Sequence, residues 1–362
     1  MAEAQVISLY PDDVPAPTPE GRSGGAEQQF GSDAGGTAAV SSRIGRPGAT
    51  GHDRGAHESG ADESGADGSG AAAGRYAAAT QPAGWERRAA AGLAFLRRRI
   101  TGDYQIDEFG FDPELTESAV LPLARQLYRN WFRTEVTGVH HLPAGSGALI
   151  VANHAGALWA LDGVMTATAV HDETPDHRFL RMLGADLVFS TPVLGQLARK
   201  TGNTLACNPD AERLLAAGEL VGVWPEGFKG IGKPFSERYK LQRFGRGGFV
   251  SAALRTGAPI IPTAIVGSEE IHPMLGNAKT LARVLGLPYF PLTPTFPWLG
   301  PLGLVPLPSK WYIEFGEPIE TADYGPDAAE DPMLVFELTD RVREQIQGSL
   351  YRLLMQRRSV WH

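Results

Sequence analysis

Short apolar runs alternate with stretches of helical periodicity from about residue 135 onward. The runs hold four to seven residues with few polar interruptions, which is typical of strands covered on both faces. This alternation predicts an α/β fold with a mostly parallel central sheet, flanked by helices that connect its strands through right-handed crossovers. The predicted strands are 135–139, 148–152, 204–207, 220–224, 260–266 and 311–315, and the predicted helices are 163–170, 193–199, 211–217 and 247–256.

Two amphipathic helices are predicted before the first strand, and one helix after the last. Apolar residues recur at helical spacing over 85–100, again over 115–132, and finally over 340–357. The first helix fits an anionic membrane surface, where its arginines would reach the headgroups, and equally an ordinary covering helix with solvated arginines. These arginines are Arg87, Arg88, Arg97, Arg98 and Arg99.

Composition separates the first 83 residues from the rest. They are rich in Gly, Ala and Ser, repeat a degenerate five-residue unit three times from His57, and hold 11 acidic residues against 5 arginines. Large apolar residues are nearly absent, so burial cannot offset the entropy of ordering this backbone. We therefore expect a disordered acidic tail over 1–83. The other expected divisions are an amphipathic helical segment over 84–133, the α/β domain over 134–325, and a C-terminal helix packed on the core over 326–362.

Charge and cysteine content narrow the class of protein. Residues 84–362 carry 30 acids and 28 bases, which is not the basic excess that nucleic-acid binding needs. The single cysteine, Cys207, excludes an internal disulfide and is expected to be a small core residue. No secretory signal is visible at the start of the chain. The uncharged stretch 284–309 contains seven prolines, so it cannot form one spanning helix, and membrane contact is expected from the surface only.

A candidate general base follows the predicted strand 148–152. Asn153-His154 comes directly after this strand, and the carboxyl ends of strands are where open α/β sheets bind their ligands. Asp162 follows eight residues after His154 in apolar surroundings. A titratable base with a nearby carboxylate is the arrangement of general-base catalysis. The alternative is that His154 caps one helix and Asp162 begins another.

Two further motifs complete a family pattern. Pro225-Glu226-Gly227 follows the strand 220–224, and Ile261-Pro262-Thr263 lies in the strand 260–266. With Asn153-His154, these blocks resemble the glycerolipid acyltransferase family in order and spacing, over roughly residues 134–320. That family has Asn-His with an Asp five residues later, then Phe-Pro-Glu-Gly-Thr-Arg and a Val-Pro-Val-like strand.

The resemblance implies an O-acyltransferase of glycerolipid synthesis. His154 would act as general base with Asp162 as its partner, and the acceptor would bind at Asn153, Glu226, Gly227 and Lys229. The co-substrate would be an acyl thioester, acyl-CoA or acyl carrier protein, with no cofactor and no metal. Because long acyl chains partition into lipid and the sequence offers docking surfaces but no spanning helix, we expect peripheral attachment to the cytoplasmic face of the cell membrane. The charge balance predicts no nucleic acid among the partners.

Two departures from the family pattern leave questions open. Trp159 stands where the family has its Asp, and on a straight helix Asp162 would lie ~12 Å along the axis from His154. Either the region around Gly156 loops and folds Asp162 back, or His154 has another partner such as Glu226. The family's phosphate-binding Arg between the blocks is also absent, whereas Lys229 matches the Arg of the Glu-Gly-Thr-Arg block.

The sequence therefore leaves alternatives for the acceptor substrate and for the class of protein. A run of cations favours a lysophospholipid or lysophosphatidate, with a neutral mono- or diacylglycerol as the alternative. An inactive lipid-binding module is the alternative of another class. A nucleotide-binding loop over 227–233 is disfavoured, because Pro234 replaces the required Ser or Thr. Glu269 and Glu270 are expected to have a structural role. The cations of the run are Lys229, Lys233, Arg238, Lys240, Arg243 and Arg246.

Overall fold

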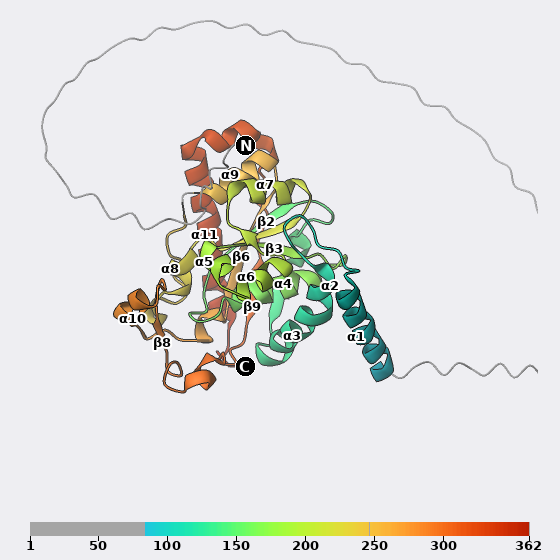
Figure 1. Ribbon diagram of the computed structural model, residues 1–362. Coiled ribbons are helices and arrows are strands. Elements are labelled where there is room, and N and C mark those ends of the chain that lie inside the picture. The colour runs from blue at the N-terminus through green and yellow to red at the C-terminus, as the bar shows by residue number, and fades with distance from the viewer. Residues whose placement is uncertain (1–83, 246, 362) are drawn as a thin grey trace, which may run out of the picture. The chain divides into compact units, whose positions relative to one another are not determined.

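The computed structural model describes residues 84–245 and 247–361, with only the backbone described for residues 84–88. The predicted tail over 1–83 and Arg246 of the predicted cationic run lie outside these residues. Figure 1 shows the arrangement of the described part, in which helices surround a central sheet.

A seven-stranded sheet has the order β1-β9-β6-β2-β5-β3-β4. Neighbouring strands are parallel except for β6 and β9, which are antiparallel. The prediction of an α/β fold with a mostly parallel sheet is therefore confirmed. The strands are β1 (Glu135–Thr137), β2 (Ala148–Ala152), β3 (Leu180–Gly184), β4 (Thr204–Leu205), β5 (Leu220–Val223), β6 (Ile260–Val266) and β9 (Tyr312–Phe315).

Strand β2 lies between β6 and β5 and is buried along its whole length. Its side chains alternate between two apolar clusters, because successive residues of a strand point to opposite faces of the sheet. Leu149 and Val151 belong to one cluster, and Ala148, Ile150 and Ala152 belong to the other. Since both faces are covered, no position of β2 meets water, which explains its unbroken apolar sequence.

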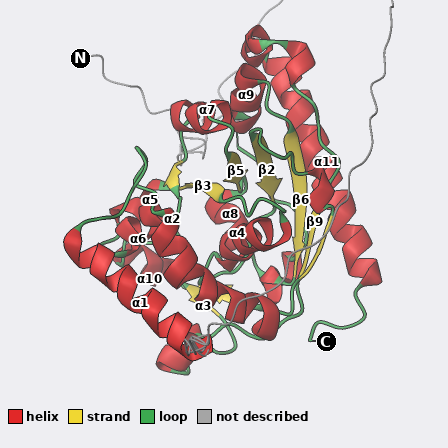
Figure 2. Cartoon of the chain, turned by 90° about the vertical axis from the view of Figure 1, so that its right-hand side faces the viewer, coloured by secondary structure: helices red, strands yellow, loops and turns green. Residues whose placement is uncertain are grey.

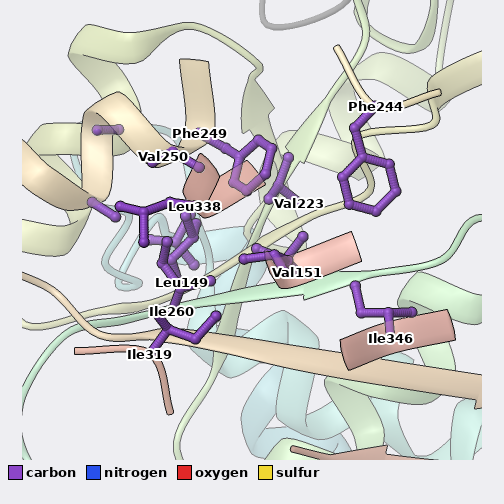
Figure 3. Packing of buried hydrophobic residues seen from close by; sticks show 14 of the residues in the cluster. Leu149, Val151, Val223, Phe244, Phe249, Val250, Ile260, Ile319, Leu338 and Ile346 are labelled. Atoms are coloured by element: carbon purple, nitrogen blue, oxygen red, sulfur yellow. The ribbon is translucent and has the colours of Figure 1, made fainter. Parts of the chain in front are cut away.

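Helices from opposite ends of the chain cover the two faces. The face of Leu149 is covered by α7 (Asn208–Ala216), α9 (Gly248–Thr256) and α11 (Pro332–Gln356). Figure 3 shows side chains of α9 and α11 packed around those of β2 and β6. The other face is covered by α4 (Leu161–Glu173) and by residues of α3 (Leu121–Arg125) and η2 (Gln126–Trp131). The remaining α-helices after β3 are α5 (Asp186–Ser190), α6 (Leu194–Lys200), α8 (Gly227–Ile231) and α10 (Lys279–Val284).

The two predicted N-terminal helices are present, and ion pairs join them. α1 (Gly84–Thr101) is followed by a loop and by a continuous helical run of four segments. Arg98 and Arg99 of α1 donate to Glu114 and Asp112, at the start of that run. Two arginines of the predicted basic flank therefore form ion pairs within the protein. The segments are α2 (Pro113–Leu115), η1 (Thr116–Val120), α3 (Leu121–Arg125) and η2 (Gln126–Trp131), of which η1 and η2 are π-helical.

Strand β3 was not predicted, and α11 begins eight residues before the predicted helix. Arg181 interrupts the apolar pattern of β3, but its side chain is buried by Asp107, at 2.7 Å, and by the ring of Phe111. α11 starts early because Asp331 caps it and accepts hydrogen bonds from the amides of the first turn. Pro332 suits the first helical position, because it has no amide hydrogen that would need an acceptor there.

Residues 271–313, here called the acid-free segment, contain no Asp or Glu. They include α10, the two-stranded sheet of β7 (Gly276–Asn277) and β8 (Pro291–Leu292), and the 3₁₀ helix η6 (Gly300–Leu304). No helix among residues 84–361 that the structure describes is long and apolar enough to cross a membrane. Large apolar side chains of this segment are nevertheless exposed, namely Leu275, Leu281, Val284, Leu285, Leu287, Trp298, Leu299, Leu302 and Val305.

Candidate active site

The motif residues meet at one edge of the sheet. His154 follows β2, and Glu226 follows the neighbouring parallel strand β5. Val151 is paired with Val223 in the sheet register, so both strands end at the same level. The first motif and the Pro-Glu-Gly motif are therefore neighbours in space, although they are about seventy residues apart in the sequence.

His154 and Asp162 form a hydrogen-bonded pair. His154 Nδ1 lies 2.7 Å from Asp162 Oδ2. The Asp162 carboxylate is fully buried and also accepts the backbone amides of Ala155 and Gly163, each at 2.9 Å. Because an ionised carboxylate can only accept, His154 donates from Nδ1, so that in the neutral ring the lone pair lies on Nε2. The His154 side chain keeps 14% of its surface exposed, so substrate can approach the ring.

A tight turn over residues 155–160 brings Asp162 back to His154. Gly156 has φ +124°, and a Cβ at this position would lie 2.1 Å from the Trp159 carbonyl oxygen. Ala157 also has a positive φ, of +52°. α4 begins only after this turn, which puts Asp162 in its first helical turn. The structure thus contains the loop that was one of the two predicted explanations for the altered spacing.

The acid-free segment supports this turn from outside. The hydroxyl of Tyr289 donates to the Ala157 carbonyl at 2.6 Å, and burial raises the pKa of Tyr289, which keeps its proton in place. The indole of Trp159 donates to the Leu304 carbonyl at 2.9 Å. Both partners lie more than a hundred residues away in the sequence, so no local pattern indicated them.

Asn153 and Glu226 hold the backbone beside the base. The Asn153 amide exchanges two hydrogen bonds with the backbone of Ile265 in β6, at 3.0 and 2.7 Å, and is fully buried. Glu226 is also buried and accepts the backbone amides of His154, at 2.8 Å, and Gln242, at 2.6 Å. This geometry favours positioning roles for both residues over the substrate contacts predicted for them.

Lys233 departs from its predicted place in the cationic run. Its buried ammonium lies 2.9 Å from Glu269 and 3.5 Å from Glu226. Burial alone would lower the pKa of Lys233, but the two carboxylates raise it above its usual value. One ammonium cannot compensate two buried carboxylates, and burial raises the pKa of Glu269 to about 7. Lys233 is therefore not available to a phosphate, which also disfavours a nucleotide-binding loop over 227–233.

The short helix α8 packs closely against His154 and carries the exposed Lys229. Gly227 begins the helix with φ +53°, and its amide donates to the Trp224 carbonyl at 3.0 Å. A Cβ on Gly230 would lie 2.8 Å from the His154 carbonyl oxygen, so α8 packs directly against the base. Lys229 is exposed and has no ion-pair partner among the residues that the structure describes. It is the predicted site residue best placed to meet a charged ligand.

Three further titratable residues, Glu269, Glu270 and Cys207, have partners or burial that indicate structural roles. Glu269 accepts the Tyr239 amide at 3.0 Å, and Glu270 pairs with Arg357 at 3.0 Å. Both thus tie loops together, as their expected structural role requires. Cys207 is buried, and burial raises the pKa of its thiol, so it lacks the thiolate character of a nucleophile.

The fold and site together define an α/β protein with a His–Asp pair at the carboxyl edge of a parallel sheet, an arrangement suited to general-base chemistry. The family model described as Acyltransferase matches residues 133–266, which contain His154, Asp162 and Glu226. The chain belongs to the acyltransferase family, and the resemblance found in its motifs is confirmed at that level.

Similar proteins occur in mycobacteria. An uncharacterized protein of Mycobacterium tuberculosis is 63% identical over 272 residues, which cover 75% of this chain and 76% of the relative. An uncharacterized protein of Mycobacterium leprae is 60% identical over 275 residues, covering 76% and 75%. Among solved structures, the 1-acyl-sn-glycerophosphate acyltransferase PlsC of Thermotoga maritima aligns with a TM-score of 0.42 at 17% identity, over 74% of this chain and 97% of that one.

Proposed function

We propose that this protein is an O-acyltransferase that moves a fatty acyl group from an acyl thioester to a hydroxyl of a lysophospholipid or lysophosphatidate. The contact between His154 Nδ1 and the buried Asp162 carboxylate carries this proposal. It holds the ring by Nδ1 with Nε2 turned away from its partner, so that the neutral imidazole can act as a general base through Nε2.

In the proposed reaction, Nε2 of His154 takes the proton of the acceptor hydroxyl as its oxygen attacks the thioester carbonyl carbon. The tetrahedral intermediate then expels the thiolate, which recovers that proton from the imidazolium. Asp162 stabilises the imidazolium between the two steps. We infer direct transfer without an acyl-enzyme, because no Ser or Cys accompanies the base within the motif and the thiol of Cys207 is buried.

The direct test is to incubate the full chain with a long-chain acyl thioester and a lysophospholipid, and to measure release of free thiol together with the acylated lipid. Both products are expected in equal amounts. An inactive lipid-binding module would retain lipid and release no thiol. Thiol release without acylated lipid would identify a hydrolase and contradict the proposal.

Lys229 supports a phosphate-bearing acceptor. It follows Gly227 on the short helix that packs on His154, and its ammonium is exposed. A charge-assisted contact to phosphate is worth about 1.5–3 kcal/mol. Lys229→Ala is therefore expected to lower kcat/KM for lysophosphatidate by roughly tenfold or more, with a small effect on diacylglycerol. Paired initial rates on the two acceptors measure this.

The outcomes of the acceptor experiment separate the two candidates. Equal loss on both acceptors would indicate a structural role for Lys229, and activity on diacylglycerol alone would establish the neutral acceptor. Arg341→Ala is the control, because Arg341 is an exposed cation of α11 that lies outside both the candidate site and the acid-free segment.

We further propose that the protein attaches peripherally to the cytoplasmic face of the membrane. Figure 2 shows α5 and α6 on the same side of the sheet, whereas Figure 1 places α1 and α10 at opposite sides of the described part, so α1 and the acid-free segment are separate candidate surfaces. Leu93, Leu96 and Ile100 of α1 are exposed, as are Val193, Leu194 and Leu197 in and next to α6. The acid-free segment itself combines exposed apolar side chains with the exposed cations Lys279 and Arg283, which suits an anionic lipid surface.

Substitution of Leu302 with serine tests this attachment. It removes an exposed apolar side chain of the acid-free segment, and partition to anionic vesicles is expected to weaken by about tenfold. Co-sedimentation measures the effect. Met333→Ser is the matched control, because Met333 is similarly exposed at the start of α11, outside the segment. Equal behaviour of the two variants, or no vesicle binding by the unmodified protein, would contradict the proposed surface.

A further inference from the structure

A basic cavity lies at the carboxyl end of β6, at the same edge of the sheet as His154 but with different lining residues. Its volume is about 580 Å³, within the ~300–1,000 Å³ typical of small-molecule sites. One wall is the loop that contains Tyr239, and the other is the end of α11 with the residues that follow it. The cavity thus joins two segments that are more than a hundred residues apart.

Four cationic residues and one acidic residue line this cavity. Glu270 is already paired with Arg357 at 3.0 Å and also accepts the hydroxyl of Tyr239. Arg357 donates further to the carbonyls of Lys310 and Val360, so it holds the chain end in place. The single carboxylate of the cavity is therefore already paired, and the other cations of the cavity have no carboxylate there to compensate their charge.

The three remaining cations are Arg238, Lys240 and Arg358, and all three are exposed. Among the described residues, none of them has a carboxylate partner; Arg238 contacts only the carbonyl and ring of Phe235. Tyr351 and Leu354 add an apolar wall on the side of α11. Several free cations beside an aromatic and aliphatic wall suit a ligand that carries phosphates on an organic ring system.

We propose that this basic cavity binds the phosphate-bearing nucleotide end of a coenzyme A thioester. The inference rests on the proposed function, in which an acyl thioester is the donor. It assigns Arg238, Lys240 and Arg358 to the donor and leaves Lys229 to the acceptor.

The acyl donor and the acceptor differ in how far their phosphates lie from the reacting group. In lysophosphatidate the phosphate and a free hydroxyl lie on neighbouring parts of one glycerol, so both must bind close to His154. The cavity is lined by none of His154, Asp162, Glu226 or Lys229, so it is misplaced for that phosphate. In a coenzyme A thioester the pantetheine arm separates the thioester from the phosphates, which allows a separate phosphate site.

Hydrogen bonds connect the cavity wall with the base. The Lys240 carbonyl accepts the ammonium of Lys233 at 3.4 Å, and the Gln242 amide donates to Glu226 at 2.6 Å. Glu226 in turn holds the His154 backbone amide. The loop that carries Lys240 is therefore fixed relative to the base, so a donor bound in the cavity has a defined approach to Nε2.

Direct binding of coenzyme A is the first test. Calorimetry on the full chain compares the unmodified protein with Lys240→Gln and Arg358→Gln, whose side chains form no ion pair in the described structure. Each substitution is expected to weaken binding by about tenfold, and added salt should weaken it further. Arg341→Gln is the matched control, because Arg341 is an exposed arginine of α11 outside the cavity. Equal affinities in all four proteins would overturn the proposal.

Kinetics with two donors supply the second test. The kcat/KM for acyl-CoA is divided by that for acyl-pantetheine, which lacks the nucleotide and its phosphates. Both cavity substitutions are expected to lower this ratio about tenfold, and Arg341→Gln should preserve it. An unchanged ratio, or a loss confined to the dependence on lysophosphatidate, would overturn the donor assignment.

The two tests also separate this inference from the proposed function. If neither donor supports acyl transfer while coenzyme A binds in a Lys240-dependent manner, the proposed reaction fails and the cavity assignment stands. If transfer occurs but coenzyme A binding is insensitive to Lys240 and Arg358, the reaction stands and the cavity assignment fails.

Discussion

Replacing His154 with alanine is expected to lower kcat/KM for acyl transfer by roughly 10²- to 10⁴-fold, the usual contribution of a positioned general base. Among residues 84–245 and 247–361, His154 is the one residue whose side chain pairs with Asp162, and the variant loses it. Initial rates of thiol release measure the loss, with circular dichroism and coenzyme A binding as checks that the variant folds. Full activity in a folded variant would rule out His154 as the base.

Asp162→Asn tests the partner of the base separately. The Asp162 carboxylate accepts three N–H groups, from His154, Ala155 and Gly163. An asparagine has one acceptor oxygen and one NH₂, so at least one of these donors would face another donor. A loss comparable with that of His154→Ala is expected, because the ring is no longer held with Nε2 free. Asp176→Asn is the control, since Asp176 is exposed and unpaired among the described residues. An unaffected rate in Asp162→Asn would rule out Asp162 as the partner on which the base depends.

Lys233→Met is expected to lower the free energy of unfolding by about 3–5 kcal/mol at pH 7, as removal of one member of a buried ionic group does. Glu226 and Glu269 would then remain buried without their cation. The folded variant would bind protons more tightly than the unfolded chain, so its stability should fall as pH rises through the carboxyl pKa values. Urea unfolding at pH 5 and pH 7 measures both effects.

A second substitution isolates the role of charge in this network. Lys233→Met with Glu269→Gln removes one of the two uncompensated carboxylates and should recover part of the lost stability. Lys229→Met is the control, because Lys229 is exposed in the same segment, and a change within about 0.5 kcal/mol is expected. If Lys233→Met unfolded at the same urea concentration as the unmodified protein, the network would not stabilise the fold.

The strands whose bounds were predicted at each residue are those whose surroundings are uniform. β2 and β6 are buried on both faces, and their predicted bounds agree with the structure at each residue. β3 was missed because Arg181 looks solvent-facing in the sequence, whereas aromatic rings and Asp107 from a distant loop bury it. Hydrophobic periodicity indicates burial among apolar neighbours. It does not identify a strand in which a charged side chain is buried by a partner from a distant part of the chain.

Part of the candidate site could also be predicted from the sequence. Asn153-His154 and Glu226 follow the ends of neighbouring parallel strands, so their proximity was implied by the sheet. The approach of Asp162 to His154 depends instead on the left-handed backbone of Gly156 and Ala157, a conformation that local propensity does not specify for alanine. Lys233 resembled its cationic neighbours in the sequence, and only the approach of Glu269 after β6 distinguishes it.

The position of β9 bears on where a self-sufficient unit of this protein ends. Residues 133–266, matched by the family model, contain β1 and β6 but not the strand between them. β9 and the two supports of the turn over 155–160, Tyr289 and Leu304, all come later in the chain. A truncation at Val266 would leave β1 without its neighbour and the His154–Asp162 turn without its outer hydrogen bonds. The stretch that the family model matches is thus shorter than the stretch that must fold together, which extends at least to Phe315.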